Sequence, residues 1–114
     1  RVIVYDGDTG AYLRHWGAYG NPPDDDYEFG ARDPNDPPPP QFSTVHGLTG
    51  SHDGLIYVAD RRGNRIQVFQ QHGEFVAEKI VAPGTLASGS AFVIQLSPDL
   101  AQEWLYLADG TNQC

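Results

Sequence analysis

Apolar positions along this chain come in short runs, and each run ends at turn residues. Residues 55–59 (LIYVA) form a compact apolar run, and residues 65–69 (RIQVF) alternate long polar with apolar side chains. Such runs predict β-strands, the second with one face in solvent. Asp53-Gly54 and Gly63-Asn64 supply the left-handed conformations of tight turns. Residues 44–75 therefore predict an antiparallel meander of four strands, the last beginning after Gly73.

The same pattern recurs on both sides of this meander. Residues 1–5 and 11–16 resemble its second half, and residues 91–96 and 104–109 resemble its first half. Tyr-x-Ala-Asp occurs at 57–60 and at 106–109, about fifty residues apart, which is a propeller-like period. The expected units are the second half of a blade, an inter-blade insertion, a complete blade and the first half of the next blade, at residues 1–20, 21–41, 42–82 and 83–114.

The expected fold class is all-β, built from four-stranded antiparallel meander blades. A meander leaves unpaired sheet edges, which are templates for further strands. We therefore expect either a fragment of a longer chain or an assembly of several copies in which strands of different chains complete blades.

The insertion is rich in proline and aspartate. Prolines 37–40 favour an extended polyproline conformation, because proline cannot donate to a sheet. Two interpretations stay open, a stiff surface loop or a lid or partner-binding loop. The acidic stretch at residues 24–28 is either a Ca²⁺ site or a solvated face, and it lacks the Asp-x-Asp-x-Asp-Gly spacing of an EF-hand.

Composition and charge restrict the classes of partner that this chain is expected to bind. The chain has 114 residues with 13 Gly and 9 Pro, which suits a turn-rich β protein. Its 15 acidic and 7 basic residues give a formal charge of −8. This argues against nucleic acid and anionic lipid as partners, since both are bound through Lys and Arg, and no apolar run is long enough for membrane insertion. Cys114 is the only cysteine, so no internal disulfide is expected.

Residues 55–69 (LIYVADRRGNRIQVF) resemble the NHL repeat, whose blades build a β-propeller, usually of six blades. The resemblance is specific over residues 42–75, good over 104–113 and fair over 1–20. Residues 45–48 (VHGL), followed by Ala-Asp-Arg and RIQVF, are similar to the lyase half of peptidylglycine α-amidating enzymes and to bacterial NHL proteins. The resemblance implies one complete propeller blade flanked by two partial blades, and a secreted or periplasmic location.

The resemblance also bears on cofactors. In the amidating lyases, the histidine that matches His46 is one of several that bind Zn²⁺ in the central channel, and neutral imidazole suits that metal. His46 is therefore either a metal ligand, for Zn²⁺ or Ca²⁺, or a polar residue lining the channel. The Asp-Gly-Tyr motif that carries the lyases' catalytic tyrosine is absent, because Asp109-Gly110 is followed by Thr111. No catalytic residue is assigned.

A candidate ligand face follows from the order of strands in a meander. The loop entering the first strand and the turn between strands two and three lie at the same end, which brings His46, Arg61 and Arg62 together. Asn112 of the next blade is expected at the same face. Arg61 and Arg62 can orient a ligand carboxylate with their rigid fork of donors, or they serve structure.

Three further polar residues are expected to hold turns. They are Asp60, Asn64 and Asp109, and Asp60 is expected to accept N–H groups in its own turn.

Three functional classes are consistent with the sequence. The first is a binding or scaffold module for a protein, peptide or glycan. The second is a metal-dependent, amidating-lyase-like enzyme with His46 as one channel ligand. The third is a structural subunit completed through open blade edges by other copies of itself or by missing blades of a longer chain.

Overall fold

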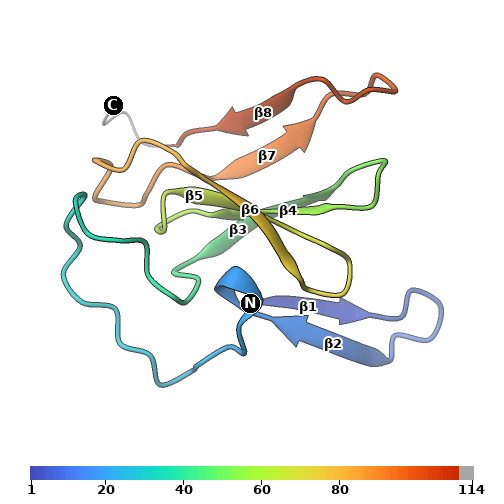
Figure 1. Cartoon of the computed structure of the whole chain (residues 1–114), viewed down its shortest axis with the longest axis horizontal. Coiled ribbons are helices and arrows are strands. Elements are labelled where there is room, and N and C mark those ends of the chain that lie inside the picture. Colours follow the sequence, from blue (N-terminus) through green and yellow to red (C-terminus); the bar gives the residue numbers. More distant parts are fainter. Residues whose placement is uncertain (111–114) are drawn as a thin grey trace.

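Over residues 1–110, which the computed structural model describes, eight strands form three antiparallel sheets (Figure 1). The sheet orders are β1-β2, β3-β4-β5-β6 and β7-β8. This confirms the expected all-β class, a four-stranded sheet flanked by two two-stranded sheets. The elements are β1 (Val2–Tyr5), β2 (Tyr12–Trp16), a 3-10 turn η1 (Ala18–Gly20), β3 (Val45–Gly50), β4 (Ile56–Asp60), β5 (Arg65–Phe69), β6 (Phe75–Ile80), β7 (Val93–Leu96) and β8 (Leu105–Ala108).

Left-handed residues occupy the hairpins of the central sheet. Gly54, Asn64 and Gly73 have φ values of 86°, 50° and 98°, in the region open to glycine and tolerated by asparagine. The turn at Asn64 lets β4 and β5 pair without a bulge, from Ile56 opposite Phe69 to Asp60 opposite Arg65. The turn residues seen in the sequence therefore set this register.

Apolar side chains cover both faces of the central sheet near its middle. On one face, Val58 and Phe69 pack with Val2 and Trp16 of the first sheet. On the other face, the buried cluster consists of Ala59, Ile66, Ala91 and Ile94. Successive residues of a strand point to opposite faces, so neighbouring residues of β4 join different clusters.

The polar residues of β5 do not face solvent, as the alternating pattern predicted. Arg65 and Gln67 are fully buried. Both make hydrogen bonds with η1 or with the end of the insertion, which lie over this face of the strand. The prediction was wrong because a period of two identifies side chains that share a face without showing what covers that face.

The insertion forms a long loop without strand or helix. It leaves η1, runs around one side of the central sheet and returns to β3 (Figure 1). None of the helical segments within residues 1–110 is long and apolar enough to cross a bilayer.

Candidate functional site

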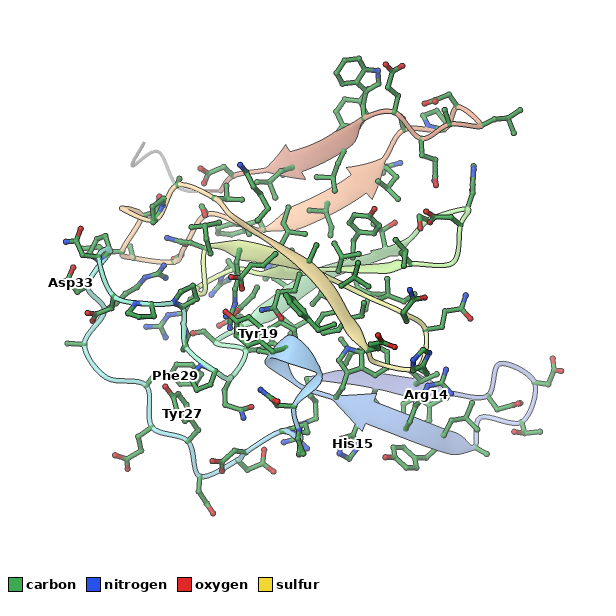
Figure 2. The ribbon with its side chains drawn as sticks, viewed as in Figure 1. Arg14, His15, Tyr19, Tyr27, Phe29 and Asp33 are labelled. Atoms are coloured by element: carbon green, nitrogen blue, oxygen red, sulfur yellow. The ribbon has the colours of Figure 1, made fainter. Side chains whose placement is uncertain are left out.

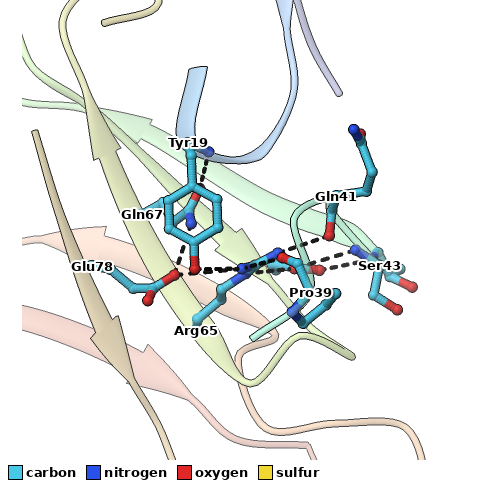
Figure 3. Close-up of polar contacts among 9 residues, drawn as sticks. Tyr19, Pro39, Gln41, Ser43, Arg65, Gln67 and Glu78 are labelled. Atoms are coloured by element: carbon cyan, nitrogen blue, oxygen red, sulfur yellow. Dashed lines mark hydrogen bonds and ion pairs between the residues drawn. The ribbon is translucent and has the colours of Figure 1, made fainter. Parts of the chain in front are cut away.

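Arg65 is the centre of a buried polar network that attaches the insertion to the central sheet (Figure 3). Its Nε donates to Asp60 Oδ2 at 3.0 Å, and both side chains are fully buried. Its Nη1 and Nη2 donate to the carbonyl oxygens of Pro39 and Gln41, each at 2.8 Å. One arginine of β5 therefore holds the end of the insertion by two backbone contacts.

Tyr19 joins the same network from η1. Its N–H donates to Gln67 Oε1 at 3.0 Å, and its hydroxyl accepts from Arg65 Nη1 at 3.2 Å. Burial raises the pKa of Tyr19 above its ordinary value, and the hydrogen bond with Glu78 raises it further, while Arg65 lowers it. The hydroxyl stays protonated at neutral pH, so the chain entering the insertion is also fixed to the sheet.

Asp60 connects the network to the start of β3. Its carboxylate accepts the N–H of Thr44 at 2.7 Å and that of Ser43 at 3.2 Å. We expected Asp60 to accept N–H groups of its own turn, whereas these donors belong to the segment that leads into β3. A buried ion pair needs such additional hydrogen bonds to offset the loss of water around its charges.

The attached insertion and the central sheet enclose a groove of about 550 Å³. This volume lies within the range of small-ligand pockets, roughly 300–1,000 Å³. The turn between β4 and β5 contributes one side of the groove, and the insertion contributes most of the other. The lining comprises Tyr27, residues 29–34 and 36–40, Ser43, Arg62, Gly63, Ile80 and Pro83.

Rigid apolar surfaces form much of the groove wall. Tyr27 and Phe29 lie together on the insertion and pack edge to face, with ring centroids 4.8 Å apart (Figure 2). Prolines 37–40 have restricted backbone angles and no N–H donors. The insertion therefore presents rings with little backbone hydrogen-bonding capacity along this stretch.

Arg32 and Arg62 are the cationic side chains of the groove. Neither takes part in an ion pair within residues 1–110. Loss of solvation lowers the pKa of Arg32, Asp60 raises it, and Arg62 and Arg65 lower it. Arg62 therefore acts on Arg32 as a like charge, and an anion bound by both would offset that effect. Asp33 and Asp36 line the same groove. Asp60 is already bound to Arg65.

His46 and Arg61 both contact Phe92, which precedes β7. The rings of His46 and Phe92 are 5.1 Å apart, and the Arg61 guanidinium lies 5.1 Å from the Phe92 centroid. His46 Nδ1 is 3.0 Å from the Phe92 carbonyl oxygen, which can only accept, so Nδ1 is the donor in this hydrogen bond. Arg62, next to Arg61, lines the groove instead. Arg61 and Arg62 therefore lie in different surroundings.

The described residues do not assemble a metal site. Within residues 1–110, no three His, Cys, Asp or Glu side chains come close enough to share an ion, either around His46 or in the acidic stretch at 24–28. His46 offers one nitrogen without a second ligand, so no chemical step through a metal follows from this geometry.

Asn64 organises the segment that follows the central sheet. Its Nδ2 donates to the carbonyl oxygens of Ala82 at 3.0 Å and Thr85 at 2.8 Å, and its Oδ1 accepts the N–H of Ser90 at 2.8 Å. Asp109 follows the end of β8. Asn112, expected at the ligand face, lies outside the described residues.

The sequence shows the types of residue that line the groove, but it does not show that these residues lie close together. Tyr27, Phe29 and Arg32 occur close together in a proline-rich stretch, which is a signal for a binding loop. Arg62 stood out only as a ligand-face candidate beside Arg61. No local pattern indicates that residues 32 and 62 line one cavity, because their proximity depends on contacts made by Arg65.

Comparison with known proteins finds one segment of the chain that matches a known family. Residues 42–69, which include β3, β4 and β5, match the family described as the NHL repeat. Neither a curated protein nor a solved structure matches the chain significantly.

Proposed function

We propose that the NHL repeat at residues 42–69 is one blade of a propeller-type binding module, and that this module takes its ligand in the groove beside the blade. The proposed ligand is a short peptide segment that carries a carboxylate next to apolar residues. The observation that carries the proposal is the pair of arginines without ion-pair partners in residues 1–110, which line one groove together with proline and aromatic rings.

The two groove arginines are the reason for proposing that the ligand carries a carboxylate. A guanidinium group presents its donors in a planar fork that matches a carboxylate, and hydrogen bonds between two charged groups are stronger than neutral ones. The chain as a whole carries a charge of −8, and Asp33 and Asp36 line the groove beside the two arginines. A carboxylate would therefore be held by direct contact with Arg32 and Arg62, and not by a net positive field.

The apolar wall of the groove, and the attachment of the insertion to the sheet, are the reasons for proposing a peptide with apolar residues. Proline and aromatic rings offer flat apolar surfaces, and the insertion is fixed at both ends by the network around Arg65. A wall already in place loses little conformational freedom on binding, which favours affinity.

Binding can be tested with fluorescein-labelled tetrapeptides that contain one glutamate among proline, leucine and phenylalanine residues, measured by fluorescence anisotropy. We expect saturable binding, and weaker binding of the matched peptides in which glutamine replaces glutamate. Arg62→Gln and Arg32→Gln should each raise the Kd about tenfold, equivalent to about 1.4 kcal/mol.

Lys79→Gln is the matched control, because it removes one positive charge from β6 at an exposed position outside the groove lining. It should leave the Kd unchanged. Peptides that fail to bind, or bind equally well to both arginine variants and the unmodified chain, would contradict the proposal.

A further inference from the structure

The strand β6 has a free edge, and this edge belongs to the complete four-stranded sheet. In the order β3-β4-β5-β6, β6 pairs with β5 and has no strand on its other side within residues 1–110. The chain continues from β6 to β7, which pairs with β8 and packs against β3 and β4. Up to residue 110, the segment that follows β6 therefore adds no strand to this edge.

The hydrogen bonds to β5 show which backbone groups of β6 point to the free edge. Val81 N donates to Asn64 O at 2.8 Å, and the pairing is regular from Ala77 to Ile80. Hydrogen-bonded and non-hydrogen-bonded pairs alternate in an antiparallel sheet, so the backbone groups of Glu78 and Ile80 point away from β5. The free edge therefore offers an N–H donor and a carbonyl acceptor at each of these two residues.

This edge ends at the groove. Ile80 lies opposite Arg65, and it also lines the groove. Residues paired across two strands share one face of a sheet, so the Ile80 side chain lies on the face where Arg65 holds the insertion. Arg62 lies in the turn that leads into Arg65 and lines the same groove. The free edge of β6 and the Arg62 side of the groove therefore lie at the same end of the central sheet.

We propose that the peptide ligand of the groove binds as an added strand, antiparallel to β6. This inference rests on the function proposed above and gives its ligand an extended backbone. The main-chain groups of the ligand pair with those of Glu78 and Ile80, and such pairing supplies affinity while side-chain pockets supply specificity. An added strand lies about 4.8 Å from β6, so it passes the groove at Ile80.

The pairing fixes which ligand side chain enters the groove. The ligand residue opposite Ile80 forms a hydrogen-bonded pair with it, and its side chain lies on the Ile80 face. The ligand glutamate belongs at this position, because Arg62 lines the groove at the same end. An antiparallel ligand then runs away from the groove, and the second residue after the glutamate lies opposite Glu78. The N–H of that second residue donates to Glu78 O, whereas the N–H of the first residue after the glutamate points to solvent.

The regular part of the edge is short. The pairing of β5 with β6 shifts register between Val68 and Phe69, and a bulge disrupts the ladder and bends its strand. Beyond β6, Ala82 takes a left-handed φ of 41°. Only Ala77 to Ile80 therefore offers a regular edge, which suits a short peptide segment.

Backbone methylation of the ligand tests the pairing. The probe is a fluorescein-labelled hexapeptide without proline, with glutamate in the third position and leucine, threonine or phenylalanine elsewhere, measured by fluorescence anisotropy. An N-methyl group on the second residue after the glutamate removes the donor to Glu78 and should raise the Kd about tenfold. The same group on the first residue after the glutamate is the matched control, and it should leave the Kd nearly unchanged because that amide faces solvent.

A pair of protein variants tests the other side of the same contact. Ile80→Pro and Ile80→Ala both remove the isoleucine side chain, but only proline also removes the outward N–H. Proline is tolerated at an edge strand where the N–H faces solvent, so the sheet should persist, which Trp16 fluorescence checks. Ile80→Pro should bind the unmethylated hexapeptide about tenfold more weakly than Ile80→Ala.

The outcomes separate this inference from the function on which it rests. An unmethylated hexapeptide that fails to bind overturns both. Binding that depends on Arg62 but responds equally to the two methyl groups leaves the groove as the site and overturns strand pairing alone. A greater loss from the methyl group on the first residue indicates a parallel strand, which overturns the antiparallel pairing. If Ile80→Pro does not fold, the two methylated peptides still decide the question.

Discussion

Arg65 ties the insertion to the sheet, so Arg65→Met should lower the free energy of unfolding by about 3–5 kcal/mol. Methionine replaces the aliphatic part of the arginine side chain but leaves the Asp60 carboxylate buried without its cation. The carbonyl oxygens of Pro39 and Gln41 lose their donors as well. Typical domains have a free energy of unfolding of only about 5–15 kcal/mol, so this loss would be a large part of the total.

Urea unfolding at one fixed protein concentration, followed by tryptophan fluorescence, measures this loss. Trp16 is a suitable probe, because it is 3% exposed and its ring lies 5.8 Å from that of Phe69. Arg65→Lys keeps the charge but lacks the fork of donors, so its loss should be smaller than that of Arg65→Met.

Arg62→Met is the control, because it removes an exposed arginine from the same hairpin, and it should change stability by no more than about 0.5 kcal/mol. Amide exchange at Thr44, whose N–H donates to Asp60, should accelerate in Arg65→Met. A loss below about 1 kcal/mol in Arg65→Met would refute the assigned role of the network.

Two further predictions concern single side chains. Asn64→Ala should destabilise the chain by about 2–4 kcal/mol in urea unfolding, because it removes the bonds to Ala82 and Thr85 and strains a residue with φ of 50°. Asn64→Gly relieves that strain and should lose about 1 kcal/mol less; equal losses would contradict a conformational role. The pKa of Tyr19 is raised in the folded chain, so its stabilising contribution is complete below about pH 10 and is lost as the pH rises through the folded-state pKa. Absorbance at 295 nm should show one tyrosine ionising after the others, and Glu78→Gln should lower that midpoint; an unchanged midpoint would exclude the Glu78 contact.

The strands of the central sheet were predictable from local sequence. The alternating run at 65–69 coincides with β5, and the apolar run at 55–59 overlaps β4 (Ile56–Asp60). Hairpin turns depend on residues within a few positions of one another, so Gly54 and Asn64 identify them. These features depend on backbone geometry and on a period of two, both of which are properties of a short segment.

The candidate site was only partly predictable. His46, Arg61 and Arg62 were expected at one face because a meander has a regular order of strands. In the structure their side chains have different surroundings. His46 and Arg61 contact Phe92, whereas Arg62 lines the groove. Phe92 had no distinguishing signal, because an aromatic residue before a strand is ordinary in any β protein.

Sequence alone determined that this chain forms short antiparallel strands with repeated halves, because hydrogen-bonded strands and tight turns impose their patterns on neighbouring residues. Tertiary structure decided which polar residues are buried and where the insertion lies. Arg65 has the same local pattern as a solvent-facing strand residue, and it is buried because Pro39, Gln41 and Tyr19 come from other parts of the chain to surround it. The groove exists for the same reason, since long-range contacts fix the insertion opposite Arg62.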